Sequence, residues 1–198
     1  MTVQPTTRPG APLTHTVLTD TPVGPLTLVA LGDALTGLYM TDQRHRPPQE
    51  SFGAPVAPDA PPFAAAIAQL RAYFRGESTA FDVPLELRGT PFQRRVWASL
   101  CTIPYGETVT YGALAQRLGT PSAARAVGLA NGRNPVGIIV PCHRVVGSDG
   151  SLTGYGGGLD RKRRLLEFER TAEGPFPVEG TAPFPVDDMA LFPVEECG

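Results

Sequence analysis

The sequence predicts an α+β N-terminal domain, an antiparallel sheet with one helix, followed by a mostly helical C-terminal domain that contains a helix-turn-helix. Three short apolar runs between residues 14 and 40, separated by Pro-Val-Gly-Pro and Gly-Asp turn signals, predict an antiparallel meander. The polar, Pro-rich residues 43–61 predict a loop. Residues 63–74 have apolar side chains at helical spacing, and residues 81–87 alternate as one further strand would.

Helix start and stop signals dominate the second half of the chain. Thr90 precedes PFQRRVWASL, in which Pro takes the first helical position, and a Pro-Tyr-Gly turn ends that helix. Thr110 can cap YGALAQRLG, which Gly119 closes, and a Thr-Pro pair opens SAARAVGLAN, which Gly132 closes. Two short helices joined by a tight turn predict a helix-turn-helix. The runs GIIVP and CHRVV, a Gly-rich loop and the basic helix LDRKRRLLEFER follow.

These signals divide the chain into four parts. Residues 1–12 are predicted to be a flexible leader, residues 13–86 the α+β domain and residues 88–170 the helical domain. Residues 171–198 are an acidic, Pro-rich tail, which we predict to be disordered.

Net charge is distributed unevenly along the chain. The formal total is −2, but residues 1–85 carry −2, residues 86–170 carry +6 and residues 171–198 carry −6. A basic middle and an acidic end are expected of a protein that binds nucleic acid. A salt-bridged surface helix beside a solvated tail explains the same pattern, so charge alone leaves both interpretations open.

Composition argues against several classes of protein. No apolar run approaches the length of a membrane span, and the first residues, MTVQPTTRPGAP, lack the apolar segment of a secretory signal. Cys101, Cys142 and Cys197 are widely spaced and odd in number, so neither a disulfide framework nor a cysteine zinc site is predicted. We therefore expect a reduced, cytoplasmic setting and no membrane partner.

The tail contains an internal repeat with a period of eight residues. PFPVEGTA, PFPVDDMA and LFPVEECG align so that Phe176, Phe184 and Phe192 are equivalent. The repeat is too short and too rich in Pro for a solenoid, which leaves low-complexity sequence or a partner-binding peptide. The stretch from Asp188 to Phe192 loosely resembles the short motif with which bacterial DNA enzymes bind the sliding clamp, although its first position departs from the usual Gln.

Cys142 and His143 carry the chemistry that stands out. A thiolate is a strong nucleophile, and a neighbouring imidazole or a positive field produces it. Adjacent side chains of an extended segment point in opposite directions, so we expect a bridging water rather than direct contact between the two. The pair alone is weak evidence, because a single Cys in an apolar segment is commonly a core residue.

The surroundings of this pair are more specific. GETVTY, ARAVG, NPV, PCHRVV and GYGGGL occur in that order. Together they resemble the O6-alkylguanine-DNA alkyltransferases over residues 90–169, and more weakly over the N-terminal strands. The resemblance implies DNA repair by irreversible transfer of the alkyl group from O6-alkylguanine to Cys142, with O4-alkylthymine as a further candidate lesion. It implies one turnover per molecule and no cofactor.

The resemblance also implies catalytic roles for five residues. Cys142 would be the nucleophile and final alkyl acceptor, and His143 the base that acts through water. Glu169 would orient the imidazole and stabilise its charge. Asn134 would brace the helix-turn-helix against the active-site loop, and Tyr111 would donate to guanine N3 and so help the leaving group.

A pocket for the base is implied as well. The carbonyls of Val145 and Cys142 would accept from the guanine amino group, and Tyr155 and the Gly156 amide would line the pocket near O6. Gly156 replaces the serine often found in this loop, so a backbone contact survives and a hydroxyl contact is lost. Some relatives bind zinc in the N-terminal domain, but this chain has only two histidines and no cysteine there, so we expect no metal.

The implied partner is double-stranded DNA with the alkylated base flipped out, bound by a monomer. Arg125 would fill the gap left by the base, and the small Ala130 and Gly132 would allow close approach, with Tyr111 on the same side. Ordinary structural roles are the alternatives, such as a helix-start aromatic for Tyr111, a surface cation for Arg125, a turn former for Asn134 and a solvated acid for Glu169.

Three other functions compete with this one. A sensor that binds lesions without repairing them is one, although such relatives lack the cysteine. A helix-turn-helix regulator would take up no alkyl group, and a Cys-His hydrolase would turn over repeatedly. Transfer of a labelled alkyl group from DNA, followed by peptide mapping, distinguishes all of them.

Overall fold

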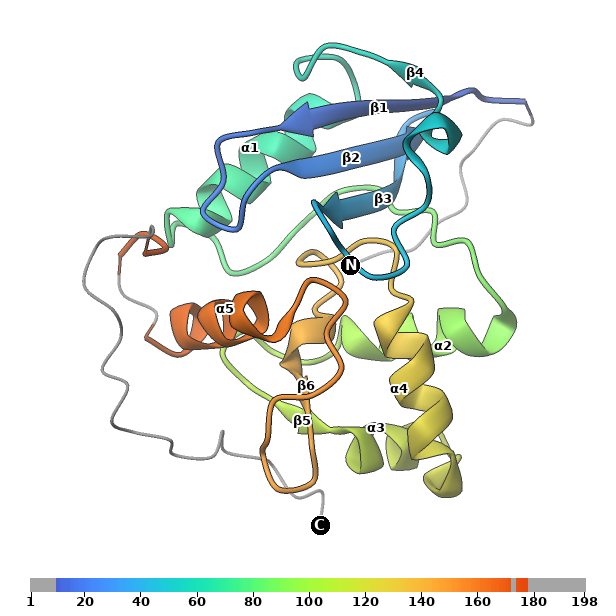
Figure 1. The fold of residues 1–198 in the computed structure, drawn as a ribbon, viewed down its shortest axis with the longest axis vertical. Helices are drawn as coiled ribbons and strands as arrows, with labels where there is room; N and C mark the ends of the chain where they lie inside the picture. The colour runs from blue at the N-terminus through green and yellow to red at the C-terminus, as the bar shows by residue number, and fades with distance from the viewer. Residues whose placement is uncertain (1–9, 172–173, 178–198) are drawn as a thin grey trace.

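The computed structural model describes residues 10–171 and 174–177. A four-stranded sheet with α1 (Phe63–Phe74) packed against it forms one half of the molecule, and the helices that follow form the other (Figure 1). This confirms the predicted fold class. Within the described residues no helix is long and apolar enough to cross a membrane, and no cluster of His, Cys, Asp and Glu is suited to a metal ion.

Three antiparallel strands form the predicted meander. They are β1 (Leu13–Leu18), β2 (Leu26–Leu31) and β3 (Ala34–Met40). The segment predicted as a loop also contains a short 3-10 helix, Gln49–Phe52, and the edge strand β4 (Ala54–Pro55), which pairs parallel with β1. The prediction of a plain loop was wrong there. The chain returns along the edge of β1 and forms hydrogen bonds with its backbone groups; for example, Val56 N–H donates to His15 O (2.9 Å).

The strand predicted at residues 81–87 is not formed. Leu85 makes only an isolated bridge with Leu35, in which Leu35 N–H donates to Pro84 O (2.9 Å) and Glu86 N–H donates to Leu35 O (2.8 Å). Pro84 has no N–H to donate, so the ladder cannot extend through it. The alternation that suggested a strand appears instead as alternate burial, of Val83, Leu85 and Leu87.

The helix-turn-helix is present. The helical half contains α2 (Pro91–Leu100), α3 (Tyr111–Arg117), α4 (Ala124–Gly132) and α5 (Leu159–Thr171). Thr110 Oγ1 accepts from Ala113 N–H (3.0 Å) to cap α3, and Gly119 follows that helix with a φ of 71°. A single 3-10 turn, Pro121–Ala123, precedes α4, so the second helix begins later than its Thr-Pro start signal.

The chain around Cys142 is a turn and not the extended segment assumed from the sequence. Cys142–Arg144 form a 3-10 turn in which Arg144 N–H donates to Pro141 O (3.0 Å). β6 (Val145–Val146) then pairs parallel with β5 (Val109–Thr110). Because Thr110 caps α3, this pairing places the start of the helix-turn-helix beside the Cys142 turn.

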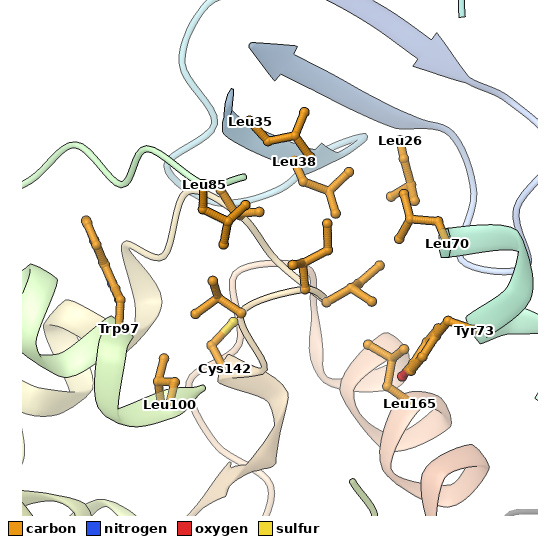
Figure 2. Packing of buried hydrophobic residues seen from close by; sticks show 14 of the residues in the cluster. Leu26, Leu35, Leu38, Leu70, Tyr73, Leu85, Trp97, Leu100, Cys142 and Leu165 are labelled. Carbon is orange, nitrogen blue, oxygen red and sulfur yellow. The ribbon is translucent and has the colours of Figure 1, made fainter. Parts of the chain in front are cut away.

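One hydrophobic core joins the two halves (Figure 2). It brings together side chains of the sheet, of α1 and of the helical half, among them Leu26, Leu35, Leu38, Leu70, Tyr73, Leu85, Trp97, Leu100, Cys142 and Leu165. Figure 2 shows Cys142 in the middle of this cluster, between α2 and α5. Because the core is shared, residues of the N-terminal half can reach the surroundings of Cys142.

The start of the first copy of the tail repeat, residues 175–177, packs against the body of the molecule. Phe176 is 4% exposed, and its ring contacts those of Phe74 and Phe168 at centroid distances of 5.6 and 4.9 Å. Its N–H donates to Phe74 O (2.7 Å), and Arg164 donates to the carbonyl of the next residue (2.8 Å). Burial of an aromatic ring therefore orders this part of the predicted tail, which corrects the prediction of disorder there. The other copies, with residues 188–192, and the leader up to residue 9 lie outside the described residues.

Candidate active site

Cys142 begins the 3-10 turn and is 6% exposed. Burial raises the pKa of its thiol, while a hydrogen bond from the Asn134 side chain and the positive charge of Lys162 act in the opposite direction. The resting group is therefore a thiol, and its neighbours include two groups that favour the thiolate.

His143 is fully buried next to it. Its Nε2 donates to Glu169 Oε1 (2.8 Å), and Nδ1 has no hydrogen-bond partner among the residues that the structure describes. Burial lowers the pKa of His143, and the Glu169 carboxylate opposes that shift. A neutral ring that donates through Nε2 carries its lone pair on Nδ1, so Nδ1 is the atom able to accept a proton.

The Glu169 carboxylate accepts several hydrogen bonds. Oε1 accepts from the Tyr73 hydroxyl (2.7 Å) and from Arg144 Nη2 (3.0 Å), and Oε2 accepts from Arg144 Nε (2.7 Å) and Gly106 N–H (3.3 Å). Burial opposes ionisation, but His143 and Arg144 outweigh it and hold the pKa of Glu169 well below its ordinary value. The charged carboxylate can therefore orient the imidazole and stabilise an imidazolium.

Two asparagines at the end of α4 brace the Cys142 turn. Asn134 Nδ2 donates to Val140 O (2.7 Å), and its Oδ1 accepts from Val136 N–H (3.0 Å). Asn131 Nδ2 donates to the carbonyl of Cys142 (3.2 Å). The contacts of Asn134 have the geometry expected of a brace between the helix-turn-helix and the active-site loop, and those of Asn131 add a second one.

Lys162 is a buried cation beside the site. Its Nζ donates to Val145 O (2.5 Å) and to Thr153 O (2.6 Å), and the residue is 0% exposed. Burial lowers the pKa of Lys162 to about 8, and Cys142 opposes this shift. Lys162 thus ties the strand after Cys142 to the Gly-rich loop and places a positive charge near the thiol.

A small cavity opens beside the thiol. It holds about 230 Å³ of empty space, counted with its opening to solvent. Its lining consists of Gln43, Asn131, Gly132, Asn134, Gly137, Cys142, Tyr155, Gly156 and Gly157. The predicted pocket residues Tyr155 and Gly156 line it, as does Gly132, which was predicted to face DNA. Val145 does not line it, because its side chain is fully buried and its carbonyl is bonded to Lys162.

Tyr111 is the first residue of α3, and its hydroxyl donates to Thr153 O (3.3 Å). Its ring lies close to Gly128 of α4, where an added Cβ would be 3.7 Å away. Burial raises the pKa of Tyr111, with the hydrogen bond to Thr153 opposing. A phenol has one proton to donate, so Tyr111 must leave the Thr153 carbonyl before it can donate to a base.

α4 presents one face to solvent. Arg125 and Leu129 lie on this face at four-residue spacing, and Leu129 is 69% exposed; the exposed Arg133 follows the end of the helix. Ala130 is only 3% exposed, and its carbonyl accepts from Trp97 Nε1 (2.8 Å). The prediction that Ala130 faces DNA is therefore wrong, because its side chain belongs to the contact between α4 and α2.

Comparison with known families accounts for both halves of the fold. The DNA-binding domain of 6-O-methylguanine DNA methyltransferase matches residues 91–171, and the ribonuclease-like domain of 6-O-methylguanine DNA methyltransferase matches residues 15–87. The chain belongs to the 6-O-methylguanine DNA methyltransferase family. This confirms the resemblance to the O6-alkylguanine-DNA alkyltransferases that the sequence motifs indicated. The docked Phe176 lies beyond the end of the family match.

Mycobacterial members of this methyltransferase family are similar over most of the chain. The methylated-DNA–protein-cysteine methyltransferase of Mycobacterium tuberculosis is 58% identical over 152 residues, 77% of this chain and 90% of the relative. The protein of that name from Mycobacterium leprae is 56% identical over 151 residues, 76% of this chain and 89% of the relative. The crystal structure of M. tuberculosis OGT in complex with DNA matches with a TM-score of 0.73 and 54% identity, over 81% of this chain and 95% of that chain.

Five side chains of this family member's site were not predicted from the sequence, namely those of Gln43, Tyr73, Asn131, Arg144 and Lys162. A signal existed for Lys162, which stands two helical turns before Glu169 and therefore shares its buried face of α5. Gln43 and Tyr73 come from the N-terminal half, and no local pattern links them to a cysteine so far along the chain.

Proposed function

We propose that this protein repairs DNA by transferring the alkyl group from O6 of an alkylated guanine to Sγ of Cys142. The observation that carries the proposal is a cavity beside a thiol whose neighbour, His143, is hydrogen-bonded to a buried carboxylate. Similar relatives bear the name methylated-DNA–protein-cysteine methyltransferase. A thioether is a poor leaving group, so each molecule acts once, and the reaction requires no cofactor.

The first step moves a proton. The thiol of Cys142 gives its proton, through a water molecule, to Nδ1 of His143, and Glu169 stabilises the resulting imidazolium. The charge of Lys162 and the hydrogen bond from Asn134 favour the thiolate that remains. The S–C bond then forms as the C–O6 bond breaks, and guanine departs with the electron pair and takes up a proton.

The departing guanine is held by donors and acceptors on two sides. The Tyr111 hydroxyl turns from Thr153 to N3 of the base, and the Gly156 amide and Tyr155 lie at the O6 side. The carbonyl of Cys142 accepts from the amino group. It already accepts one hydrogen bond, from Asn131, and a carbonyl oxygen can accept two.

DNA binds to the exposed face of α4. The target atom is stacked inside the duplex, so the base must be flipped out. Arg125 fills the space that the base leaves, and the exposed Leu129 adds an apolar wedge beside it. The basic charge of residues 86–170 supplies contacts to phosphates that do not depend on sequence. The protein acts as a monomer in the cytoplasm, and a sliding-clamp contact at residues 188–192 stays a prediction.

Intact-protein mass spectrometry after incubation with duplex DNA containing O6-methylguanine tests this function. We expect a gain of one methyl group per molecule, mapped to Cys142, and none for Cys142→Ser. The matched control is Cys101→Ser, which removes the other free thiol among the described residues and should retain full uptake. Binding without methyl uptake would identify a sensor or regulator, and repeated turnover a hydrolase; either result contradicts the proposal.

A further inference from the structure

The turn that follows β3 reaches the Gly-rich loop of the helical half. Arg44 N–H donates to Gly156 O (2.8 Å), and Gln43 is the residue of the N-terminal half that lines the cavity beside Cys142. Figure 1 shows this turn directed from the sheet toward the helical half. The wall of the cavity is therefore built by both halves of the molecule.

The conformation of this turn fixes the Gln43 side chain. Asp42 and His45, on either side of Gln43 and Arg44, have φ angles of 59° and 64°. Non-glycine residues in the left-handed region are uncommon, carry a conformational cost and cluster at functional sites. Gln43 Oε1 accepts from Met40 N–H (3.0 Å). The carbonyl end of the amide is thus used by the backbone, and the NH₂ end is left as a donor at the cavity.

The same turn lies against Gly156, the position where a serine is often found. A Cβ added there would lie 3.4 Å from Arg44 O and 3.5 Å from Gln43 Cγ. These are ordinary van der Waals distances, so the turn borders the space that a serine side chain would enter. The hydroxyl donor often found at this position is lost, and a side-chain amide donor arrives beside it from the other half of the molecule.

We propose that Gln43 donates a hydrogen bond through Nε2–H to O6 of the alkylated guanine and so determines how strongly the leaving group is stabilised. This rests on the proposed function, which places O6 near Tyr155 and Gly156. As the C–O6 bond breaks, negative charge develops on the base, and a donor aimed at O6 gains strength in the transition state.

Single-turnover kinetics on two substrates test this role. Duplexes carry either O6-methylguanine or S6-methylthioguanine, whose sulfur is a much weaker hydrogen-bond acceptor than oxygen. Gln43→Ala should lower the rate constant for methyl transfer from oxygen about tenfold, the effect of losing one hydrogen bond of ordinary strength in the transition state. Its effect on transfer from sulfur should be about twofold or less. A purely structural role would slow both substrates equally.

Two further variants sharpen the test. Gln43→Glu replaces the donor with a carboxylate that repels the developing charge, so it should be slower than Gln43→Ala and recover as the carboxylate protonates at lower pH. Gly156→Ser, introduced into the Gln43→Ala background, has the space to place a hydroxyl near O6 and should restore part of the rate for the oxygen substrate only.

The control is Gln49→Ala, which removes the same amide from a residue whose partners are Arg46 and His15 rather than the cavity. Its rate constant for methyl transfer should equal that of the unmodified chain on both substrates. The role of Gln43 would be overturned if Gln43→Ala and the unmodified chain transferred the methyl group at equal rates. It would also be overturned if Gln43→Ala lowered the rate constant by the same factor on the oxygen and the sulfur substrate. Either result leaves the proposed function intact. Absence of methyl transfer by the unmodified chain would instead overturn the proposed function.

Discussion

The two halves of the molecule contribute to the site in different ways. The helical half supplies Cys142, His143 and Glu169, which lie within one turn and one helix. The sheet half has no comparable motif, yet it supplies Tyr73, which donates to Glu169, and Gln43, which lines the cavity. A site built by consecutive motifs can therefore depend on residues that lie far from those motifs in the sequence and reach the site only in the folded molecule.

The contributions also differ in charge. The helical half buries ionised or ionisable groups that depend on each other, whereas the sheet half offers neutral donors at the edge of that network. Removing one member of a buried charged pair leaves an uncompensated charge, and removing a neutral donor leaves an acceptor that has other partners. This difference sets the order of the effects expected from substitutions in the two halves.

Glu169→Gln should have the largest effect on stability. It keeps the shape of the side chain but leaves the Arg144 guanidinium without its carboxylate partner, so the free energy of unfolding should fall by about 3–5 kcal/mol. Methyl transfer should also slow, since the imidazolium of His143 loses its counter-charge. Urea unfolding and single-turnover kinetics measure the two effects.

The matched control for that variant is Glu167→Gln, on the same helix but partly exposed. It should change the free energy of unfolding by less than about 0.5 kcal/mol. If the two variants are equally stable, the buried network around Glu169 does not make the predicted contribution to the free energy of unfolding.

Lys162 should produce an intermediate effect that depends on pH. Its pKa in the folded protein is lowered to about 8, whereas an unfolded lysine keeps its ordinary value near 10.5. Between these two values the unfolded chain binds more protons than the folded chain, so stability rises as pH increases from 8 toward 10. The expected rise is about 1–2 kcal/mol, after allowance for the opposing titration of buried tyrosines and of the Cys101 and Cys142 thiols, whose pKa values burial raises.

The variant that isolates this contribution is Lys162→Met. Lys162 is the only lysine in the sequence, so no other amine side chain confuses the comparison. The variant should be less stable at every pH, because two buried carbonyls lose their donor, but its urea midpoint should not rise between pH 8 and 10. A parallel rise in both proteins would show that Lys162 does not titrate in this window.

Local signals in the sequence were sufficient to predict much of this structure. The cap at Thr110, the left-handed Gly119 and the Pro at the start of α2 each act within a few residues, and the helices begin and end close to where these signals stand. The meander was predictable for the same reason, because turn signals separate its strands.

The features that could not be predicted from the sequence depend on contacts between segments that are distant along the chain. Pro84 interrupts the ladder of a segment whose alternation suggested a strand, and the 3-10 turn at Cys142 follows from packing against the helices around it. Lys162 was predictable in principle from its helical register with Glu169. Gln43 was not, because its position in the cavity requires the N-terminal turn and the Gly-rich loop to meet in the folded molecule.

Tyr73→Phe should have the smallest effect, and it tests whether the sheet half acts on the chemistry at all. The substitution removes the hydroxyl that donates to Glu169 Oε1 and keeps the ring, so the free energy of unfolding should fall by about 1–1.5 kcal/mol. Glu169 retains its bonds to Arg144 and His143, and methyl transfer at neutral pH should slow only a few-fold.

The informative readout for that variant is the pH dependence of methyl transfer. Without the Tyr73 donor, Oε1 becomes a stronger acceptor for His143, which raises the pKa of the imidazole and moves the acid limb of the profile to higher pH. Tyr105→Phe is the control, because its ring packs against Tyr73 but it makes no bond to Glu169 among those seen in the described residues. A shift in the first variant and none in the second would mean that a residue from the N-terminal half sets the proton affinity of the base. Identical profiles would confine the chemistry of proton transfer to the helical half.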